Sequence, residues 1–228
     1  GGHAQGDTIS NFENISGSAF VDYLNGDNTA NKIYGNNGND YIQGLEGSDV
    51  LNGDDGFDFV WYGSSNAGVN VDLLTNVVSG GHAEGDTISN FENIYGSDYD
   101  DVLFGDNTDN LIYGSNGNDI LYGGDGDDIL NGGVGFDYLN GGAGDDILYG
   151  EENIDWFWFD GFWGDDIIMD WEDGVDKVNM SNSGLTVDDL SLGADSSGNT
   201  VVLDPFSNSI TFEGITNGII TADDFIFV

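Results

Sequence analysis

The sequence of 228 residues contains no cysteine and one proline, and only Lys32 and Lys177 are basic. The lack of cysteine excludes a disulfide framework and a thiolate metal site. No apolar run approaches the roughly 18 residues of a transmembrane helix, so we expect no membrane insertion. Forty-three acidic residues give a formal net charge of −41. Because this charge repels polyanions, we expect neither nucleic acid nor an acidic membrane as a partner.

Two kinds of chain fit this charge and the 38 glycines. One is a disordered chain, for which high net charge is typical. The other is a folded chain whose charge is neutralised by bound cations. Hydrophobic residues make up 38% of the sequence and aromatic residues 13%, which is high for disorder, so the composition favours the folded chain.

A nine-residue repeat runs through 17–61 and 96–158, with units such as GSNGNDILY, GGDGDDILN and GGAGDDILY. The sixth residue is Asp or Asn in every unit, and the eighth is apolar. This pattern predicts a six-residue turn followed by a three-residue strand whose eighth residue points inward. Such a short strand cannot bury its apolar side alone, so we expect stacked coils of two units each. The glycine density excludes helix.

The units of the form GGxGxDxUx, where U is apolar, resemble the RTX (repeats-in-toxin) calcium-binding nonapeptide. The resemblance implies an all-β, right-handed parallel β-roll with Ca²⁺ between turns on the same side. It implies that sixth-position carboxylates and backbone carbonyls near the glycines are the ligands. Ca²⁺ takes six to eight oxygen ligands of these kinds, which agrees with the composition of the turns.

Same-side turns lie 18 residues apart, so we expect Asp40 to pair with Asp58, Asp119 with Asp137, and Asp128 with Asp146. With the resemblance, the candidate side-chain ligands are Asp22, Asp40, Asp49, Asp58, Asp101, Asp119, Asp128, Asp137, Asp146, Asp155, Asp166 and Asp176. The candidate carbonyl ligands are Gly35, Gly38, Gly53, Gly114, Gly117, Gly123, Gly126, Gly132, Gly135, Gly141 and Gly144. We expect five to eight ions. The alternative is that Asp is present only because it favours turns.

Some pairs depart from the pattern. The turns of Asp101 and Asp155 lack the expected glycines, so we expect weaker sites between Asp101 and Asp119 and between Asp137 and Asp155. Asn31 and Asn110 place an amide at the sixth position. The amide lowers the local charge, and we expect weaker ions there or none.

A longer repeat lies over the short one, because residues 1–58 align with 80–137 at an offset of 79. Residues 62–79 precede the second copy without an equivalent before the first, so we expect the natural chain to extend upstream. The connector from GVNVDLL to GDTISNFENI (68–94) resembles the longer connectors between RTX blocks and predicts further coils with longer loops. Asp7 and Asp86 are either ligands or plain turn residues, and His3 and His82 are expected to be loop residues.

The C-terminal region, 159–228, is expected to be an antiparallel β cap on the β-roll of 1–158. Residues 161–181 resemble the closing segment of RTX domains, with Asp166, Asp170, Asp173 and Asp176 as ligands of a last site or as an acidic surface. Alternating apolar residues around Pro205 predict a hairpin. The aromatic residues are either core of the cap or, at Trp156, Trp158 and Trp163, a stacking platform for a sugar. The acidic–apolar tail, 223–228, resembles a type I secretion signal.

No catalytic motif is present, and we expect a non-enzymatic calcium-binding module of a larger protein that could itself be an enzyme. We expect it to fold on extracellular Ca²⁺ and to support the secretion and stability of a secreted or bacterial surface protein. Its partners would be Ca²⁺ and the type I secretion machinery, and we expect a monomer. The alternative is an adhesion or carbohydrate-binding module that uses the cap aromatics or a face of the roll.

Overall fold

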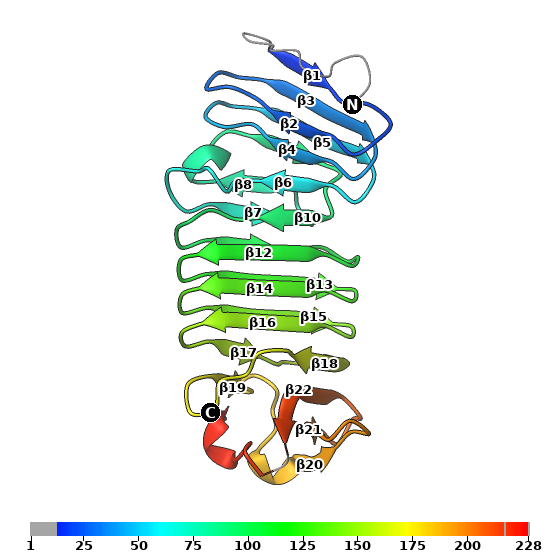
Figure 1. Ribbon diagram of the computed structural model, residues 1–228, viewed down its shortest axis with the longest axis vertical. Coiled ribbons are helices and arrows are strands. Elements are labelled where there is room, and N and C mark those ends of the chain that lie inside the picture. Colours follow the sequence, from blue (N-terminus) through cyan, green and yellow to red (C-terminus); the bar gives the residue numbers. More distant parts are fainter. Residues whose placement is uncertain (1–12, 217, 228) are drawn as a thin grey trace.

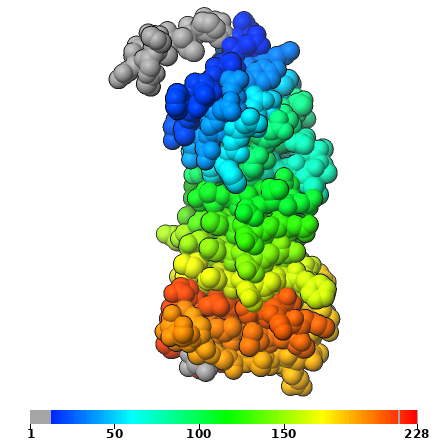
Figure 2. All heavy atoms as spheres, turned by 90° about the vertical axis from the view of Figure 1, so that its right-hand side faces the viewer, coloured from blue at the N-terminus to red at the C-terminus, as the bar shows by residue number. Residues whose placement is uncertain are grey.

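The computed structural model describes residues 13–216 and 218–227, so His3 and Asp7 lie outside the described residues. The described chain is all-β, and its short 3₁₀ turns are η2 (Gly81–Ala83), η3 (Val187–Asp189) and η4 (Ala222–Asp224). Its strands stack into a parallel β-solenoid that forms an elongated body (Figures 1 and 2). In this part of the chain no helix has the length and apolar character needed to cross a membrane.

One face of the roll is an eleven-stranded sheet, which we call the long sheet. Its neighbouring strands are parallel from β2 to β22, and only β22, β21 and β20 pair antiparallel. In spatial order the strands are β2 (Tyr23–Asn25), β4 (Tyr41–Gln43), β6 (Phe59–Trp61), β10 (Asn93–Tyr95), β12 (Leu111–Asn116), β14 (Ile129–Val134), β16 (Ile147–Glu152), β18 (Asp165–Ile168), β22 (Ser209–Thr216), β21 (Asn199–Leu203) and β20 (Ser191–Ala194).

The strands that alternate with these along the chain form two further sheets. The four-stranded sheet contains β1 (Asn14–Ser16), β3 (Lys32–Asn37), β5 (Val50–Asp55) and β9 (Thr87–Ser89). The eight-stranded sheet contains β8 (Val77–Ser79), β7 (Asn70–Asp72), β11 (Val102–Phe104), β13 (Ile120–Asp125), β15 (Tyr138–Ala143), β17 (Trp156–Trp158), β19 (Lys177–Asn179) and β23 (Phe225–Ile226). One coil therefore contributes one strand to each face, as the two-unit coil predicted.

The register confirms the 18-residue coil, since Ile112 pairs with Leu130 and Leu121 with Leu139. The eighth residues from Ile33 to Phe157 are all fully buried and form one continuous core. The strand length differs from the prediction, because seven strands run to six residues. In these strands the parallel ladder continues past the apolar triplet into the glycine-rich turn.

Neighbouring residues of β14 give a matched test of this core. Leu130 is 0% exposed and Ile129 is 37% exposed. We expect Leu130→Ala to lower the free energy of unfolding by about 2–5 kcal/mol, because it leaves a cavity in the stack. Ile129→Ala, on the outer face, should change it by less than about half of that. Denaturant titrations in saturating calcium measure both, and equal losses would contradict the inward eighth position.

The connector between the two copies departs partly from further regular coils. β9 pairs with β5 at an offset of 37 residues, and β10 pairs with β6 at an offset of 34. β7 also joins a parallel sheet, beside β11, but β8 folds back on β7 as an antiparallel hairpin. The connector thus supplies one coil of the roll and inserts a hairpin next to β11.

The C-terminal region contains the predicted hairpin, β21 and β22, and closes one end of the body (Figure 1). Parallel stacking continues beyond residue 158, because β18 and β19 extend the two faces and β23 in the tail pairs with β19. Trp163 is 2% exposed and packs on Phe159, so of the two alternatives for this residue the structure favours core of the cap. Trp156 and Trp158 are half-buried beside Tyr138.

Candidate metal sites

The sixth-position aspartates form two ladders, one along each edge of the roll where the turns stack. In each ladder a backbone N–H donates to the Oδ1 atom of the aspartate one coil later. The N–H of Asp40 donates to Asp58 (2.7 Å), that of Asp119 to Asp137 (2.8 Å), and that of Asp128 to Asp146 (2.8 Å). The structure therefore brings together the three best pairs that the spacing predicted.

The ladders include the other candidate positions as well. The same bond joins Asp22 to Asp40, Asn31 to Asp49, Asp101 to Asp119, Asn110 to Asp128, Asp137 to Asp155, Asp146 to Asp166 and Asp155 to Asp176. At the connector the acceptors are Asp86, for the N–H of Asp49, and Glu92, for that of Asp58. Sequence reasoning did not select Glu92 as a site residue, although it occupies the sixth position when the register is counted back from Gly96.

Among the residues that the structure describes, nine aspartates have a second carboxylate oxygen that is buried and has no hydrogen-bond partner there. These nine are Asp40, Asp49, Asp58, Asp119, Asp128, Asp137, Asp146, Asp155 and Asp166. A buried polar atom without a partner is rare, because each one loses its hydration without compensation. Nine at repeating positions indicate a shared missing partner, and it must be a donor or a cation because a carboxylate oxygen accepts.

Burial shifts the titration of these carboxyls strongly. It raises the pKa of Asp119, Asp128 and Asp155 to about 8, and the negative charges of neighbouring aspartates add to the rise. The pKa of Asp166 rises to about 9 for the same reasons. Without a cation, the charged form is thus unfavourable at neutral pH in the folded chain.

Glycine backbones form the rest of each cradle. A Cβ atom added at Gly35 would lie within 3.0 Å of both Asp40 Oδ2 and the carbonyl oxygen of Gly53. At Gly114 it would meet Asp119 Oδ2 and the carbonyl of Gly132, and at Gly123 it would meet Asp128 Oδ2 and the carbonyl of Gly141. The fourth-position glycines stack likewise, since a Cβ at Gly135 would meet the carbonyl of Gly117 and one at Gly144 that of Gly126.

These oxygens fit a hard divalent cation. Each cradle offers carboxylate and carbonyl oxygens, which Ca²⁺ accepts, and no nitrogen or sulfur ligand. Within 13–216 and 218–227 no three acidic, His or Cys side chains converge, so a cation bound in a cradle would meet at most two carboxylates, together with backbone carbonyls. A divalent charge would neutralise the two stacked carboxylates that burial otherwise makes unfavourable.

The comparison with protein families agrees with this chemistry. The family model of the RTX calcium-binding nonapeptide repeat matches four times, at 11–41, 25–60, 95–130 and 122–157. The chain contains RTX calcium-binding nonapeptide repeats in these two stretches. The matches cover all but the last residue of each stretch in which the nine-residue unit was found. The search of curated proteins found no relative of the chain.

Solved structures of similar shape include two repeat subunits of the mannuronan C5-epimerase from Azotobacter vinelandii. AlgE6R2 is 25% identical, with a TM-score of 0.43 over 55% of this chain and 91% of that chain. AlgE6R3 is 28% identical, with a TM-score of 0.33 over 57% of this chain and 78% of that chain. The extracellular lipase LipA from Serratia marcescens is 18% identical, with a TM-score of 0.30 over 97% of this chain and 41% of the lipase.

Proposed function

We propose that this chain is a non-enzymatic module that folds when it binds extracellular Ca²⁺ and thereby supports the secretion, folding and stability of a larger secreted or surface protein. The nine buried, unpartnered carboxylate oxygens carry the proposal. They recur at the sixth position of RTX calcium-binding repeats, next to glycine carbonyls, which is the donor set that Ca²⁺ prefers.

The proposed side-chain ligands are the nine aspartates with a free Oδ2 atom. The proposed carbonyl ligands are those of the glycines predicted from the sequence, from Gly35 to Gly144. Asp22, Asp101 and Asp176 have less support, because a backbone N–H already occupies the Oδ2 atom of each. Asp170 accepts from the N–H groups of Gly150 and Glu151 and has the same weakness.

Isothermal titration calorimetry of the metal-free chain tests the proposal. We expect several Ca²⁺ ions per chain, and much weaker binding of Mg²⁺, which demands a smaller octahedral site and keeps its water ligands. Binding of less than one Ca²⁺ per chain at millimolar concentration would refute the proposed function.

The tail gives the secretion role a structural reason. β23 lies inside the 223–228 segment and pairs with β19, and Asp224 lies 3.8 Å from the Lys177 ammonium group. A signal held in a sheet is hidden in the folded chain, so export machinery would read it before calcium folds the cap. Deleting 223–228 should abolish type I export while most of the calcium binding remains; unchanged export would contradict this role.

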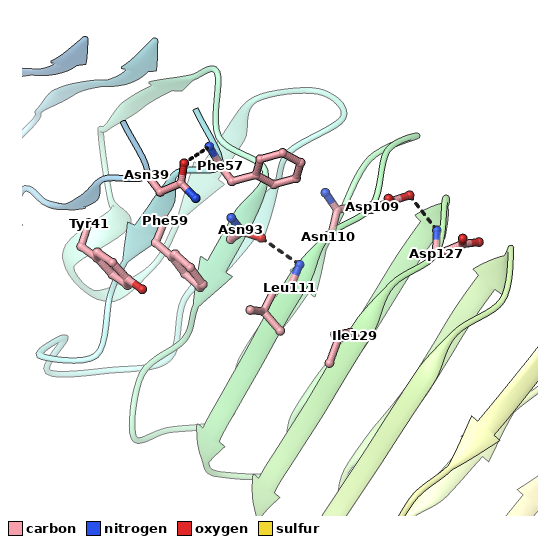
Figure 3. Close-up of a pocket in the computed structure, with 10 residues that line it drawn as sticks. All are labelled: Asn39, Tyr41, Phe57, Phe59, Asn93, Asp109, Asn110, Leu111, Asp127 and Ile129. Carbon is pink, nitrogen blue, oxygen red and sulfur yellow. Dashed lines mark hydrogen bonds between the residues drawn. The ribbon is translucent and has the colours of Figure 1, made fainter. Parts of the chain in front are cut away.

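A groove on the long sheet favours neutral glycan binding as a second candidate function (Figure 3). The groove has a volume of about 330 Å³, and the rings of Tyr41, Phe59 and Phe57 line it together with Asn39 and Asn93. Phe57 is 56% exposed, so its ring is available to stack on a sugar. The exposed amide of Asn39 can bond hydroxyl groups of a sugar, whereas the net charge disfavours anionic sugars.

A glycan array in calcium tests this second function. We expect hits among neutral glycans that Phe57→Ala reduces at least tenfold, whereas Phe206→Ala, at a 63% exposed ring of the cap, leaves them unchanged. No hits, or equal losses in the two variants, would rule the groove out.

A further inference from the structure

The nonapeptide turns adopt two conformations, and the second residue of the turn distinguishes them. In eight turns this residue has a positive φ, between 68° and 125°: Asn36, Leu45, Asp54, Ser115, Gly124, Gly133, Gly142 and Glu151. The sixth residues of these turns are Asp40, Asp49, Asp58, Asp119, Asp128, Asp137, Asp146 and Asp155, and every one has an unpartnered Oδ2 atom. We call these the open turns.

Four other turns, which we call the closed turns, lack this positive φ. They are 17–22, 26–31, 96–101 and 105–110. In each of them the N–H of the second residue donates to the side-chain oxygen of the sixth, as Asp106 does to Asn110 (2.7 Å). The oxygen that faces the cradle in an open turn therefore already has a partner in a closed turn.

Strand pairing accounts for the difference in every open turn except 44–49, which follows the three-residue strand β4. In most open turns the ladder runs through the turn, so that Ser115 pairs with Gly133 and Gly124 with Gly142. The second residue then belongs to the sheet and does not donate to the aspartate. Before the closed turns the strands β1, β2, β10 and β11 end after three residues, and the turn folds back on its own side chain.

The fourth residue correlates with the two conformations. It is Gly in seven open turns and Asn153, with φ of 93°, in the eighth, but Phe20, Thr29, Tyr99 or Thr108 in the closed turns. Gly117 has φ of 136°, which a side chain disfavours, and a Cβ there would lie within 3.0 Å of the Tyr99 backbone. The two cap turns are outside this pattern. In 161–166 Phe162 lacks the positive φ although the Oδ2 atom of Asp166 has no partner, and 171–176, in which Trp171 replaces the first glycine, is closed despite Gly174.

The sixth residue gives an independent indication. Two closed turns have an amide there, Asn31 and Asn110, whereas all eight open turns have a carboxylate. An amide satisfies the N–H donor of a closed turn as well as a carboxylate does, but it cannot neutralise a cation. The two closed turns of each 79-residue copy follow one another and make up one coil.

We propose that the fourth residue of each turn determines whether the turn binds calcium, and that one coil per 79-residue copy closes without the ion. This inference rests on the proposed function. It predicts that the ions occupy two blocks, one at the open turns of 35–58 and one that runs from the open turns of 114–155 to the adjoining Asp166 of the cap. The connector and the closed coil of 96–110, which hydrogen bonds alone complete, separate the two blocks. A roll built this way has a fixed, ion-independent coil at a defined place in every large repeat.

Counting the bound ions on the full chain by native mass spectrometry and calorimetry tests the inference. Tyr99→Gly changes the closed turn GSDYDD to GSDGDD, close to the open turn GSNGND of 114–119. We expect this variant to bind one more Ca²⁺ than the wild type. Tyr99→Ala is the matched control, because it removes the ring but keeps a Cβ atom, and it should bind the wild-type number.

A second pair of variants does not depend on opening a turn. Asp101→Asn, in a closed turn, should leave the ion count unchanged, and Asp119→Asn, one coil later, should lower it by at least one. No gain with Tyr99→Gly, or equal losses in the two Asn variants, would overturn the inference while the proposed function stands. A wild-type chain that binds no calcium would refute the proposed function itself.

Discussion

Removing calcium at neutral pH should abolish the β-sheet signal of the whole chain. The fold places nine carboxylates with unpartnered oxygens in its interior and carries a net charge of −41. Without a cation these charges repel one another at close range, and the chain pays the full desolvation of each buried carboxylate. We therefore expect far-UV circular dichroism in excess EGTA at pH 7.5 to show a disordered chain, and a β-rich spectrum when calcium is restored.

The size of the effect follows from mass action. If a site binds with a Kd of about 10⁻⁴ M, as extracellular modules can, roughly 10 mM Ca²⁺ stabilises the folded state by about 2.7 kcal/mol per site. Five such sites would contribute on the order of 13 kcal/mol, which is comparable to the stability of a typical domain. At submicromolar calcium this contribution nearly vanishes. A β-rich spectrum that survives chelation, with Mg²⁺ absent as well, would show that the ions are not needed.

Acidification should stabilise the metal-free chain, which is the second large effect. The folded pKa of Asp119, Asp128 and Asp155 is raised to about 8 and that of Asp58 to about 7, above the value near 4 of an unfolded chain. The folded state therefore binds more protons than the unfolded state between pH 4 and about 8. Its stability is largest near pH 4 and is lost as the pH rises through the folded pKa values.

Each unit of pKa corresponds to about 1.4 kcal/mol, so several such carboxyls decide whether the metal-free chain folds. We expect metal-free protein, prepared on a chelating resin, to be unfolded at pH 8 and to regain β-structure near pH 5. With 10 mM Ca²⁺ we expect the opposite pH dependence, with greater stability at pH 8 than near pH 5, because protons and calcium compete for the same oxygens. Thermal melts across this range measure both curves, and a metal-free chain that loses stability on acidification would contradict the burial of these carboxyls.

The regular part of the fold was predictable because its information is local and repeated. The eighth residues, such as Leu121 and Leu130, give the register of both faces, and the 18-residue spacing places Asp119 beside Asp137. Where the pattern of one unit is ambiguous, the same positions of the neighbouring units determine its register. For the same reason the continuous core could be predicted without knowledge of long-range contacts.

The irregular parts could not be predicted in this way. The offsets of 37 and 34 residues at the connector, which place Asp86 and Glu92 in the ladders, depend on how the hairpin of β7 and β8 packs. The burial of Trp163 depends on the tertiary packing of the cap. Turn closure depends on backbone φ, and Ser115 and Ser97 show that the second residue alone does not determine it, since one lies in an open turn and the other in a closed turn.

The central claim is that cations between stacked turns bind the unpartnered oxygens of the buried carboxylates. A structure of crystals grown in calcium tests this claim most directly. The account predicts spherical density between the turns, with the Oδ2 atoms of Asp119, Asp128 and Asp137 at about 2.3–2.6 Å from the ions. Exchange of calcium for a cation with an anomalous signal would identify the peaks. If the same three side chains point to solvent, or bond only to water, the central claim is contradicted.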